Sequence, residues 1–397
     1  MYFPQDEYEE RWRRIYDAME VKGIATALVW GRTAGTYERH GDLLYLTNYY
    51  SSQSGHDYDT DWWTGLGFSA VLMHERDVPL LVADEPDYPS ELLPIAVERV
   101  VWGENVLVTV AEVLKARGIT EGRVALVGED FLPAKYYRLL TEALPGVEFV
   151  ADDRLVRDVR LHKTQRELDC YREAGVAVSA AMTALMERAV RGGTQAEAAA
   201  AGASELVRRG GFPHMVPVAS GNDMYHFAGD PITGSSPAIS MSDGDMVRAW
   251  VYGPAWQGYW CDPGRTAVVG GKPRPDQRAL IGAANDIVSR VMEAIRPGVR
   301  VKDIVNLGSQ LRREAGTEDD QAARMFPLYG HGIGLYWEEP YFTEGWKNEV
   351  TAFHEGQTVT AETFLYRPGV GSAGVEQNFI VGRERNELLT TTELEWW

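Results

Sequence analysis

The chain has 397 residues, of which 45% are hydrophobic and 24% charged, a balance typical of a globular protein that is long enough for two domains. Its formal net charge of -19 argues against nucleic acid and anionic membranes as partners and favours a small cationic or zwitterionic ligand. No stretch reaches the length of a transmembrane helix, and the acidic start lacks an apolar signal core. The two cysteines offer neither a disulfide framework nor a zinc site, so a reducing cytoplasm is expected.

The N-terminal part of the chain alternates between apolar strands and amphipathic helices. This alternation predicts an α/β domain. The charge-rich stretch 152–160 is the best candidate for a domain boundary, so we expect domains at 1–157 and 158–397. Helices are predicted at 6–22, 108–117 and 133–144, and strands at 25–30, 69–73, 79–83, 124–127 and 147–150.

The C-terminal part places its helices before a final run of strands. This order predicts an α+β domain. Thr194, with Glu197 three residues later, is typical of a capping box at the start of a helix. Helices are predicted at 165–189, 194–209, 276–295 and 301–314, and strands at 216–220, 357–364, 375–381 and 387–391.

The segment 245–266 is interpreted as a β-hairpin that carries a candidate ligand. Gly253-Pro254 is predicted to mark the reversal of the chain, and Asp262 follows the second aromatic run. A buried carboxylate at that place needs a hydrogen bond, an ion pair or a metal. The alternative, a solvated turn aspartate, remains open from the local sequence.

Three further residues could act as ligands. His331 lies between glycines, which leave an imidazole uncovered, although a turn histidine is the commoner case. Glu362 and Glu376 each interrupt an apolar strand, and either could simply face solvent. Together with Asp262, these side chains would suit one divalent cation such as zinc, manganese or iron.

Several stretches in order along the C-terminal half carry a resemblance to the creatinase/prolidase/methionine-aminopeptidase superfamily, which has the pita-bread fold. The N-terminal part is similar to the creatinase-type N-terminal domain. The resemblance implies an α/β domain followed by an α+β pita-bread domain. The matching stretches are 161–175, 262–266, 296–304, 330–334 and the strands around Glu362 and Glu376.

The resemblance also implies which side chains serve the site. Family peptidases hold two metals with two Asp, one His and two Glu. Here Asp262, His331, Glu362 and Glu376 match, but Val251 stands where the first Asp belongs. Glu338 stands near the place of a second family histidine and is a candidate catalytic residue.

Two interpretations follow from these departures. Either one metal still binds, with His331 and Glu362 serving both as ligands and in catalysis, or the protein resembles creatinase and works without metal. Creatinase uses a histidine in a segment that corresponds to the one carrying His226. His226 could equally be an ordinary polar loop residue.

Aromatic residues crowd the same segments. They could form a substrate box for a cationic group through cation–π attraction, or they could pack the core. In family dimers the N-terminal loop reaches the neighbour's active site, so a homodimer is expected. The substrate-binding candidates are Trp62, Trp63, Trp250, Tyr252 and Trp337.

From these features we expect a cytoplasmic, homodimeric enzyme acting on a small polar molecule. Hydrolysis of a non-peptide C–N bond ranks first. A metal-assisted lyase similar to the dimethylsulfoniopropionate lyases ranks second, and an Xaa-Pro dipeptidase or aminopeptidase third. A catalytically inactive binding module remains as a fourth hypothesis. The expected cofactor is either one divalent metal ion (zinc, manganese or iron) or none.

Overall fold

The computed structural model describes residues 2–33, 41–53, 56–57, 64–221, 226–317, 326–343, 345 and 347–397. Within it the chain divides into two compact units, Met1–His162 and Lys163–Trp397. The boundary predicted between residues 157 and 158 falls inside helix α5 (Arg154–Arg160). Trp62 and Trp63 lie outside the described residues. No helix in the described part of the chain is long and apolar enough to cross a membrane.

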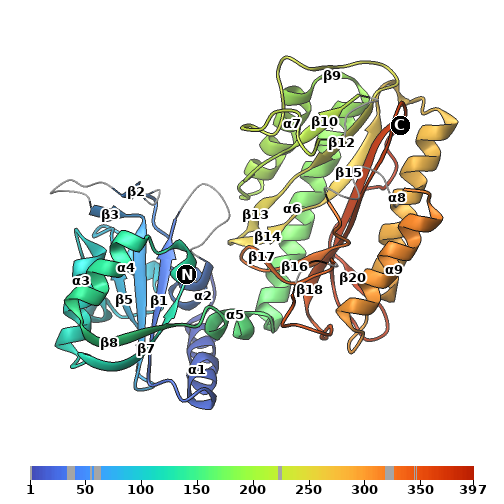
Figure 1. Cartoon of the computed structure of the whole chain (residues 1–397). Helices are drawn as coiled ribbons and strands as arrows, with labels where there is room; N and C mark the ends of the chain where they lie inside the picture. Colours follow the sequence, from blue (N-terminus) through green and yellow to red (C-terminus); the bar gives the residue numbers. More distant parts are fainter. Residues whose placement is uncertain are drawn as a thin grey trace. The chain divides into compact units, whose positions relative to one another are not determined.

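The first unit is a mixed sheet with helices on both faces (Figure 1). Its strands lie in the order β6-β5-β4-β1-β7-β8, and β1 pairs antiparallel with β4 but parallel with β7. Apolar residues of α3 and α4 cover one face and form this unit's core. The helices are α1 (Gln5–Val21), α2 (Gly41–Thr47), α3 (Val106–Ala116), α4 (Ala134–Ala143) and α5, with short 3-10 turns at Ser90–Leu92, Val97–Arg99 and Glu129–Phe131; the strands are β1 (Thr26–Arg32), β2 (His56–Asp57), β3 (Thr64–Leu66), β4 (Phe68–His74), β5 (Leu80–Ala83), β6 (Val100–Trp102), β7 (Glu121–Val127) and β8 (Gly146–Ala151).

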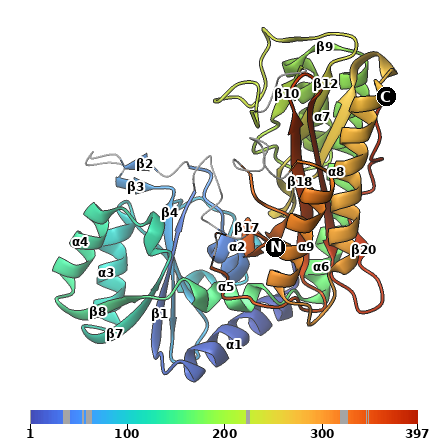
Figure 2. The same cartoon turned by 45° about the vertical axis from the view of Figure 1, so that its right-hand side comes forward.

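The second unit is one long sheet flanked by two helix pairs. In Figure 1 the green helix α6 lies beside the yellow strands β13 and β14, and the orange helix α8 lies beside the red strands; Figure 2 shows the same unit from another side. The sheet runs β10-β12-β15-β19-β18-β16-β17, and β20 pairs with β19. The helices are α6 (Gln165–Val190), α7 (Gln195–Arg208), α8 (Pro275–Ala294) and α9 (Val301–Glu314), with a 3-10 turn at Val269–Gly271. The strands are β9 (Gly193–Thr194), β10 (Val218–Ser220), β11 (Ser240–Met241), β12 (Met246–Trp250), β13 (Gly253–Trp256), β14 (Tyr259–Cys261), β15 (Gly264–Val268), β16 (His331–Ile333), β17 (Trp337–Tyr341), β18 (Thr358–Arg367), β19 (Gly371–Ile380) and β20 (Glu387–Leu388).

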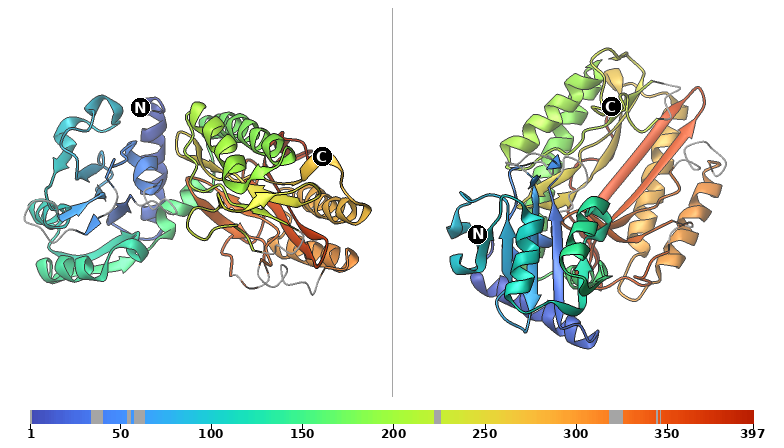
Figure 3. Two further views of the ribbon diagram at one scale, coloured as in Figure 1. Left: turned by 90° about the horizontal axis from the view of Figure 1, so that it is seen from above. Right: turned by 60° about the vertical axis from the view of Figure 1, so that its left-hand side comes forward.

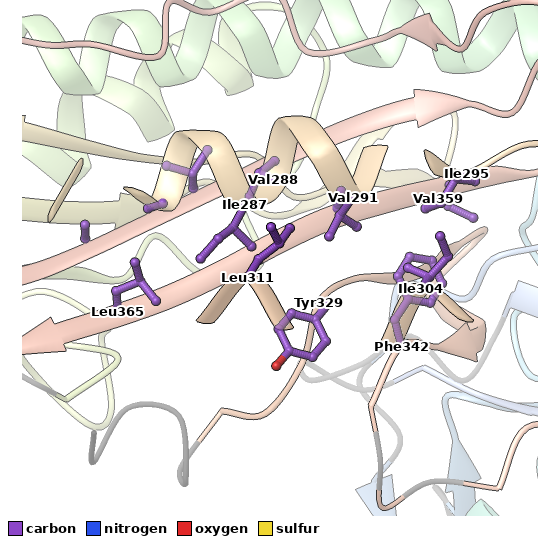
Figure 4. Close-up of a cluster of buried hydrophobic side chains, with 14 of the residues drawn as sticks. Ile287, Val288, Val291, Ile295, Ile304, Leu311, Tyr329, Phe342, Val359 and Leu365 are labelled. Atoms are coloured by element: carbon purple, nitrogen blue, oxygen red, sulfur yellow. The ribbon is translucent and has the colours of Figure 1, made fainter. Parts of the chain in front are cut away.

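The long hairpin of β18 and β19 separates an apolar face from a polar one. Successive side chains of a strand point to opposite faces. Val359 and Leu365 of β18 pack against α8 and α9, as Figure 4 shows, and Val375 of β19 belongs to the same core. Glu362 and Glu376, which lie directly opposite each other, therefore point to the other face. The right-hand view of Figure 3 shows this red hairpin running beside the orange helices.

The predicted hairpin turn at Gly253-Pro254 is wrong. Gly253 is the first residue of β13, and the chain reverses at Gln257-Gly258, where both residues have positive φ, 49° and 88°. Two consecutive positive φ angles are the mark of a type I′ hairpin turn, and a Gln-Gly pair is a weaker signal for it than Asn-Gly. The reversal therefore comes closer to Asp262 than expected.

Candidate metal centre

Backbone pairing brings distant residues into one row across the sheet. Trp250 of β12 lies opposite Gly264 of β15, which lies opposite Glu376 of β19, which lies opposite Glu362 of β18. Residues paired in this way project from the same face of a sheet. One row thus carries an indole and two carboxylates, all of them buried.

His331 and Asp262 add their side chains to this row. His331 opens β16, the strand next to β18, and Asp262 lies between β14 and β15. Both are buried, with exposed fractions of 0% and 1%. From Nε2 of His331, the distances are 3.3 Å to Oδ2 of Asp262, 3.6 Å to Oε1 of Glu362 and 3.7 Å to Oε1 of Glu376.

The four atoms that converge here are all buried and lack hydrogen bonds. Within the described residues, Nε2 of His331 and the three facing carboxylate oxygens have no hydrogen-bond partner. Buried polar atoms without partners are costly, so such a convergence indicates a missing ligand. Suitable ligand atoms of Asp262, His331 and Glu376 all lie within 4.8 Å of one another. The mixed oxygen and nitrogen set fits a divalent cation.

On three of these residues, the remaining polar side-chain atom is already engaged. Nδ1 of His331 lies 2.9 Å from the carbonyl oxygen of Gly332, which favours a proton on Nδ1 and leaves Nε2 as the electron-pair donor. The side-chain NH₂ of Asn378 donates to Oδ1 of Asp262 at 2.9 Å, and the Asn378 oxygen accepts from the Asp262 backbone N–H. Nε1 of Trp250 donates to Oε2 of Glu376 at 2.7 Å. Each of these ligands is therefore held in a fixed orientation.

Burial and mutual repulsion raise the proton affinity of the carboxylates in the absence of a cation. Burial, with the charge of Asp262 adding to it, raises the pKa of Glu362 to about 7. Burial and the charges of Asp262 and Glu362 raise the pKa of Glu376. Burial lowers the pKa of His331, but Asp262 and Glu362 outweigh it, so the net pKa is raised. A bound cation would remove this strain between like charges.

Trp250, and not a carboxylate, is the β12 residue that reaches the row. A Cβ at Gly264 would lie 2.4 Å from Nε1 of Trp250, so only glycine there lets the indole cross to Glu376. Val251, which the sequence resemblance matched to the family's first Asp, is buried and offers no ligand atom. The described residues thus hold a ligand set for one cation.

Glu338, predicted as a catalytic residue, lies in a different environment. Its Oε2 accepts a hydrogen bond from Nζ of Lys163 at 2.8 Å, and both side chains are at most 2% exposed. Trp337, the preceding residue on β17, has its ring 4.5 Å from the ring of His331. Because neighbours on a strand alternate between faces, Glu338 points away from the ligand cluster.

His226 lies at the surface. Its side chain is exposed, and its backbone carbonyl accepts a hydrogen bond from the guanidinium of Arg248. The structure does not bring its imidazole to the cluster of ligand atoms within the described residues. The predicted catalytic role of His226 therefore gains no support from its surroundings.

The predicted aromatic box is filled by its own rings. Trp250, Tyr252 and Trp260 form a buried cluster against which Trp337 packs. Tyr252 and Trp260 stack with centroids 6.5 Å apart. The core-packing alternative thus describes these rings in the structure, apart from Trp62 and Trp63, which lie outside the described residues.

Asn378 and Arg248 were missed by sequence analysis. Both interrupt apolar strands, as Glu362 does, and Asn378 follows Glu376 by two residues on the same face. The signal that singled out the glutamates was therefore present for these two residues as well.

Fold and ligand set together define a two-domain pita-bread protein with a buried cluster of side chains that fit a divalent cation. Residues 169–383 match the metallopeptidase family M24, and residues 11–162 match the creatinase/prolidase N-terminal domain. The chain belongs to metallopeptidase family M24 and is an enzyme of that family, as the resemblance implied.

Its relatives include proteins named as peptidases. The probable dipeptidase PepE of Mycobacterium tuberculosis is 32% identical over 260 residues, which cover 65% of this chain and 66% of that protein, just under two thirds of its length. The Xaa-Pro dipeptidase of Pyrococcus horikoshii is 26% identical over 279 residues, which cover 69% of this chain and 75% of that protein.

Solved structures share the fold over nearly the whole chain. Dipeptidase PepE from Mycobacterium ulcerans superposes with a TM-score of 0.77 at 25% identity, covering 99% of this chain and 98% of the other. The prolidase from Pyrococcus horikoshii superposes with a TM-score of 0.75 at 22% identity, covering 98% and 100%. At 22% identity, the similarity to this prolidase shows a shared fold alone.

These relatives overturn the first-ranked functional hypothesis. Hydrolysis of a non-peptide C–N bond in a small cationic or zwitterionic molecule was wrong as the leading expectation, because the relatives are named as dipeptidases and Xaa-Pro dipeptidases. The peptidase alternative is favoured. The expectation gave too much weight to the ligand inferred to be missing at Val251 and too little to the similarity to peptidases along most of the chain.

Proposed function

We propose that this protein is a metal-dependent peptidase that cleaves short peptides and uses one divalent cation. The observation that carries the proposal is the convergence of four buried, unpaired ligand atoms from Asp262, His331, Glu362 and Glu376. The names of the dipeptidase relatives support the peptide substrate.

The residues of the chain have separable roles in this proposal. Asp262, His331, Glu362 and Glu376 would hold the cation. When bound, such an ion polarises a carbonyl oxygen and lowers the pKa of a coordinated water. Asn378 orients Asp262, and Trp250 orients Glu376 while keeping its second oxygen from other ligands. The apolar rings around the row exclude bulk water, which strengthens electrostatic interactions there.

The experiment combines metal analysis with a peptide panel. We expect about one tightly bound divalent ion per chain after loading with Zn²⁺, Mn²⁺ or Fe²⁺, because the chain offers a single ligand set. Dipeptides, including Xaa-Pro, should be hydrolysed by the loaded protein and not by the chelated protein. The variant Asp262→Asn should lose both the ion and the activity.

Two results would contradict the proposal. One is hydrolysis that persists unchanged in chelated protein, and the other is full metal occupancy without cleavage of any peptide in the panel. Two tightly bound ions per chain would show that a further ligand takes the place of the missing aspartate. The homodimer and the cytoplasmic location stay predictions, to be tested by sedimentation and by cell fractionation.

A further inference from the structure

Two carboxylates of the ligand cluster direct one oxygen toward His331 and the other toward an N–H donor of this chain. Oδ2 of Asp262 and Oε1 of Glu376 lie 3.3 Å and 3.7 Å from Nε2 of His331. Their second oxygens accept hydrogen bonds from Nδ2 of Asn378 at 2.9 Å and from Nε1 of Trp250 at 2.7 Å. Each carboxylate therefore has one oxygen for a cation and one that is occupied by a protein N–H group.

The side-chain amide of Asn378 has only one orientation that satisfies its contacts. Its oxygen accepts a hydrogen bond from the backbone N–H of Asp262 at 2.9 Å. Because that N–H can only donate, the amide oxygen must face it, and the NH₂ group must face Oδ1 of the same aspartate. Asn378 is also fully buried, and its own backbone N–H donates to the hydroxyl of Thr390. The donor is thus fixed against the carboxylate.

The indole of Trp250 lies in a slot that two glycines leave open. A Cβ at Gly264 would lie 2.4 Å from Nε1 of the indole, and a Cβ at Gly374 would lie 2.3 Å from its Cη2. The residue is 2% exposed. An indole nitrogen donates a hydrogen bond and offers no lone pair to a metal. The ring therefore binds a carboxylate at this place but cannot bind a cation.

A second cation would need the oxygens that these two donors occupy. In sites with two metal ions, the ions lie about 3.5–4 Å apart, and a carboxylate that joins them binds one ion with each oxygen. Here the second ion would lie beside Oδ1 of Asp262 and Oε2 of Glu376, where the two N–H groups now donate. A hydrogen bond to a carboxylate favours its ionised form, as a nearby cation does.

We propose that Trp250 and Asn378 take the place of a second cation and restrict the metal centre to one ion. The inference rests on the proposed function and adds to it the two residues that set the number of ions. Replacing both N–H donors by carboxylate oxygens should therefore create a second cation site in this chain.

The test counts bound Mn²⁺ in the full-length unsubstituted protein, in Trp250→Asp, in Asn378→Asp and in the double variant. Aspartate is shorter than tryptophan and leaves room for an ion beside Glu376, while Asn378→Asp keeps the shape and replaces the NH₂ donor by an oxygen. Elemental analysis should give about one ion per chain in the first three proteins and about two in the double variant. Each single variant keeps one of the two donors, so its second site stays incomplete.

Electron paramagnetic resonance provides a readout that does not depend on protein concentration. Two Mn²⁺ ions about 4 Å apart are magnetically coupled, whereas a single ion shows its own hyperfine pattern. The coupled signal should appear in the double variant alone. The inference would be overturned by a double variant that binds its first ion tightly but holds no second one. Two ions in the unsubstituted protein would overturn it as well.

Trp260→Asp combined with Asn378→Asp is the matched control. Trp260 is 0% exposed and belongs to the same aromatic cluster as Trp250, where its ring stacks on Tyr252. The control adds the same number of carboxylates to the same core but leaves the indole on Glu376 in place. It should hold one ion. Two ions in this protein would show that added acid anywhere in the cluster suffices, and the role of Trp250 would be rejected.

If the double variant does not fold, nuclear magnetic resonance of the unsubstituted protein provides the test. The indole N–H signal of Trp250, identified by its loss in Trp250→Phe, should exchange slowly with solvent even in a large excess of Zn²⁺, because the N–H stays on Glu376. Faster exchange in excess Zn²⁺ would mean that a second ion displaces the indole, and would overturn the inference.

Metal counting also separates this inference from the proposed function. If the loaded unsubstituted protein holds one ion and cleaves no peptide, the proposed function fails, while the count in the double variant still tests Trp250 and Asn378. If the unsubstituted protein cleaves peptides with one ion and the double variant also holds one, the inference alone fails.

Discussion

At the scale of single residues, the ligand cluster lowers the stability of the metal-free protein. Three carboxylates lie around Nε2 of His331 without hydrogen bonds on their facing oxygens. Such an arrangement stores repulsion in the metal-free protein. Sequence analysis could name these residues because each breaks an apolar pattern, but the pattern contains no information on which atoms converge. Trp250 illustrates the limit: its sequence left substrate contact and core packing open, and only the structure shows its indole donating to Glu376.

Glu362→Gln should therefore stabilise the metal-free protein while abolishing metal binding. The substitution removes one buried charge and keeps the shape, so unfolding in chelator at pH 8 should require about 1–3 kcal/mol more free energy. Glu355→Gln, at an exposed ion pair with Arg383, is the control and should change stability by less than about 0.5 kcal/mol. A less stable Glu362→Gln protein would mean that the carboxylate is held by structural hydrogen bonds.

Gly264→Ala should weaken both folding and metal binding. Its new Cβ would lie 2.4 Å from Nε1 and 2.6 Å from Cε2 of Trp250, so the buried indole must move away from Glu376. Overpacking of this kind costs about 1–3 kcal/mol. Gly282→Ala is the matched control, because no heavy atom lies within 4 Å of its Cβ on α8, and it should stabilise by roughly 0.5–1 kcal/mol. Equal effects of the two substitutions on urea unfolding would refute the packing argument.

At the scale of elements, helices were easier to predict than strands. The predicted helix 301–314 coincides with α9, and the capping box of Thr194 and Glu197 forms at the start of α7. Helix signals are local, because periodicity and caps lie within one segment. Strand β19 begins at Gly371 and not at the predicted residue 375, because its pairing with β18 extends through Gly374 to Gly371. Strand limits depend on a distant partner, which a single sequence does not reveal.

The β18–β19 hairpin should tolerate loss of core packing less well than loss of exposed surface. Leu365 is fully buried against the helices, so Leu365→Ala should cost about 2–5 kcal/mol. Leu388→Ala removes the same atoms from an exposed position of β20, where 41% of the residue is accessible, and should cost well under 1 kcal/mol. Metal stoichiometry should remain unchanged in both folded variants, as measured by elemental analysis; loss of metal in folded Leu365→Ala would show that the two faces of the hairpin are not independent.

At the scale of the whole molecule, the chain has separate apolar cores in its two units. All four ligand residues belong to Lys163–Trp397. The resemblance could predict that all four ligands belong to the second unit, because it concerns the order of motifs along the entire chain. It could not predict how the site differs from the family pattern in three dimensions, since that depends on which side chain of β12 reaches the carboxylates.

Metal should therefore stabilise the second unit selectively. A cation present at 100 times its dissociation constant contributes about 2.7 kcal/mol to the state that binds it. In calorimetry we expect the transition of Lys163–Trp397 to move to higher temperature, while any separate transition of Met1–His162 stays in place. The Asp262→Asn protein should show no metal-induced shift. A shift confined to the first unit would place the cation elsewhere.

The glycine at position 374 carries a consequence for how such a chain could have arisen. A Cβ there would lie 2.3 Å from Trp250 and 2.6 Å from Cδ of Arg248, and Gly264 similarly makes room for Trp250. A lineage could acquire the large side chains only after both glycines were in place, because the reverse order passes through overpacked intermediates. The two glycines and the large side chains that pack on them should therefore covary among descendants. Enlarging a glycine alone should destabilise the fold more than enlarging it together with a reduction of its large partner.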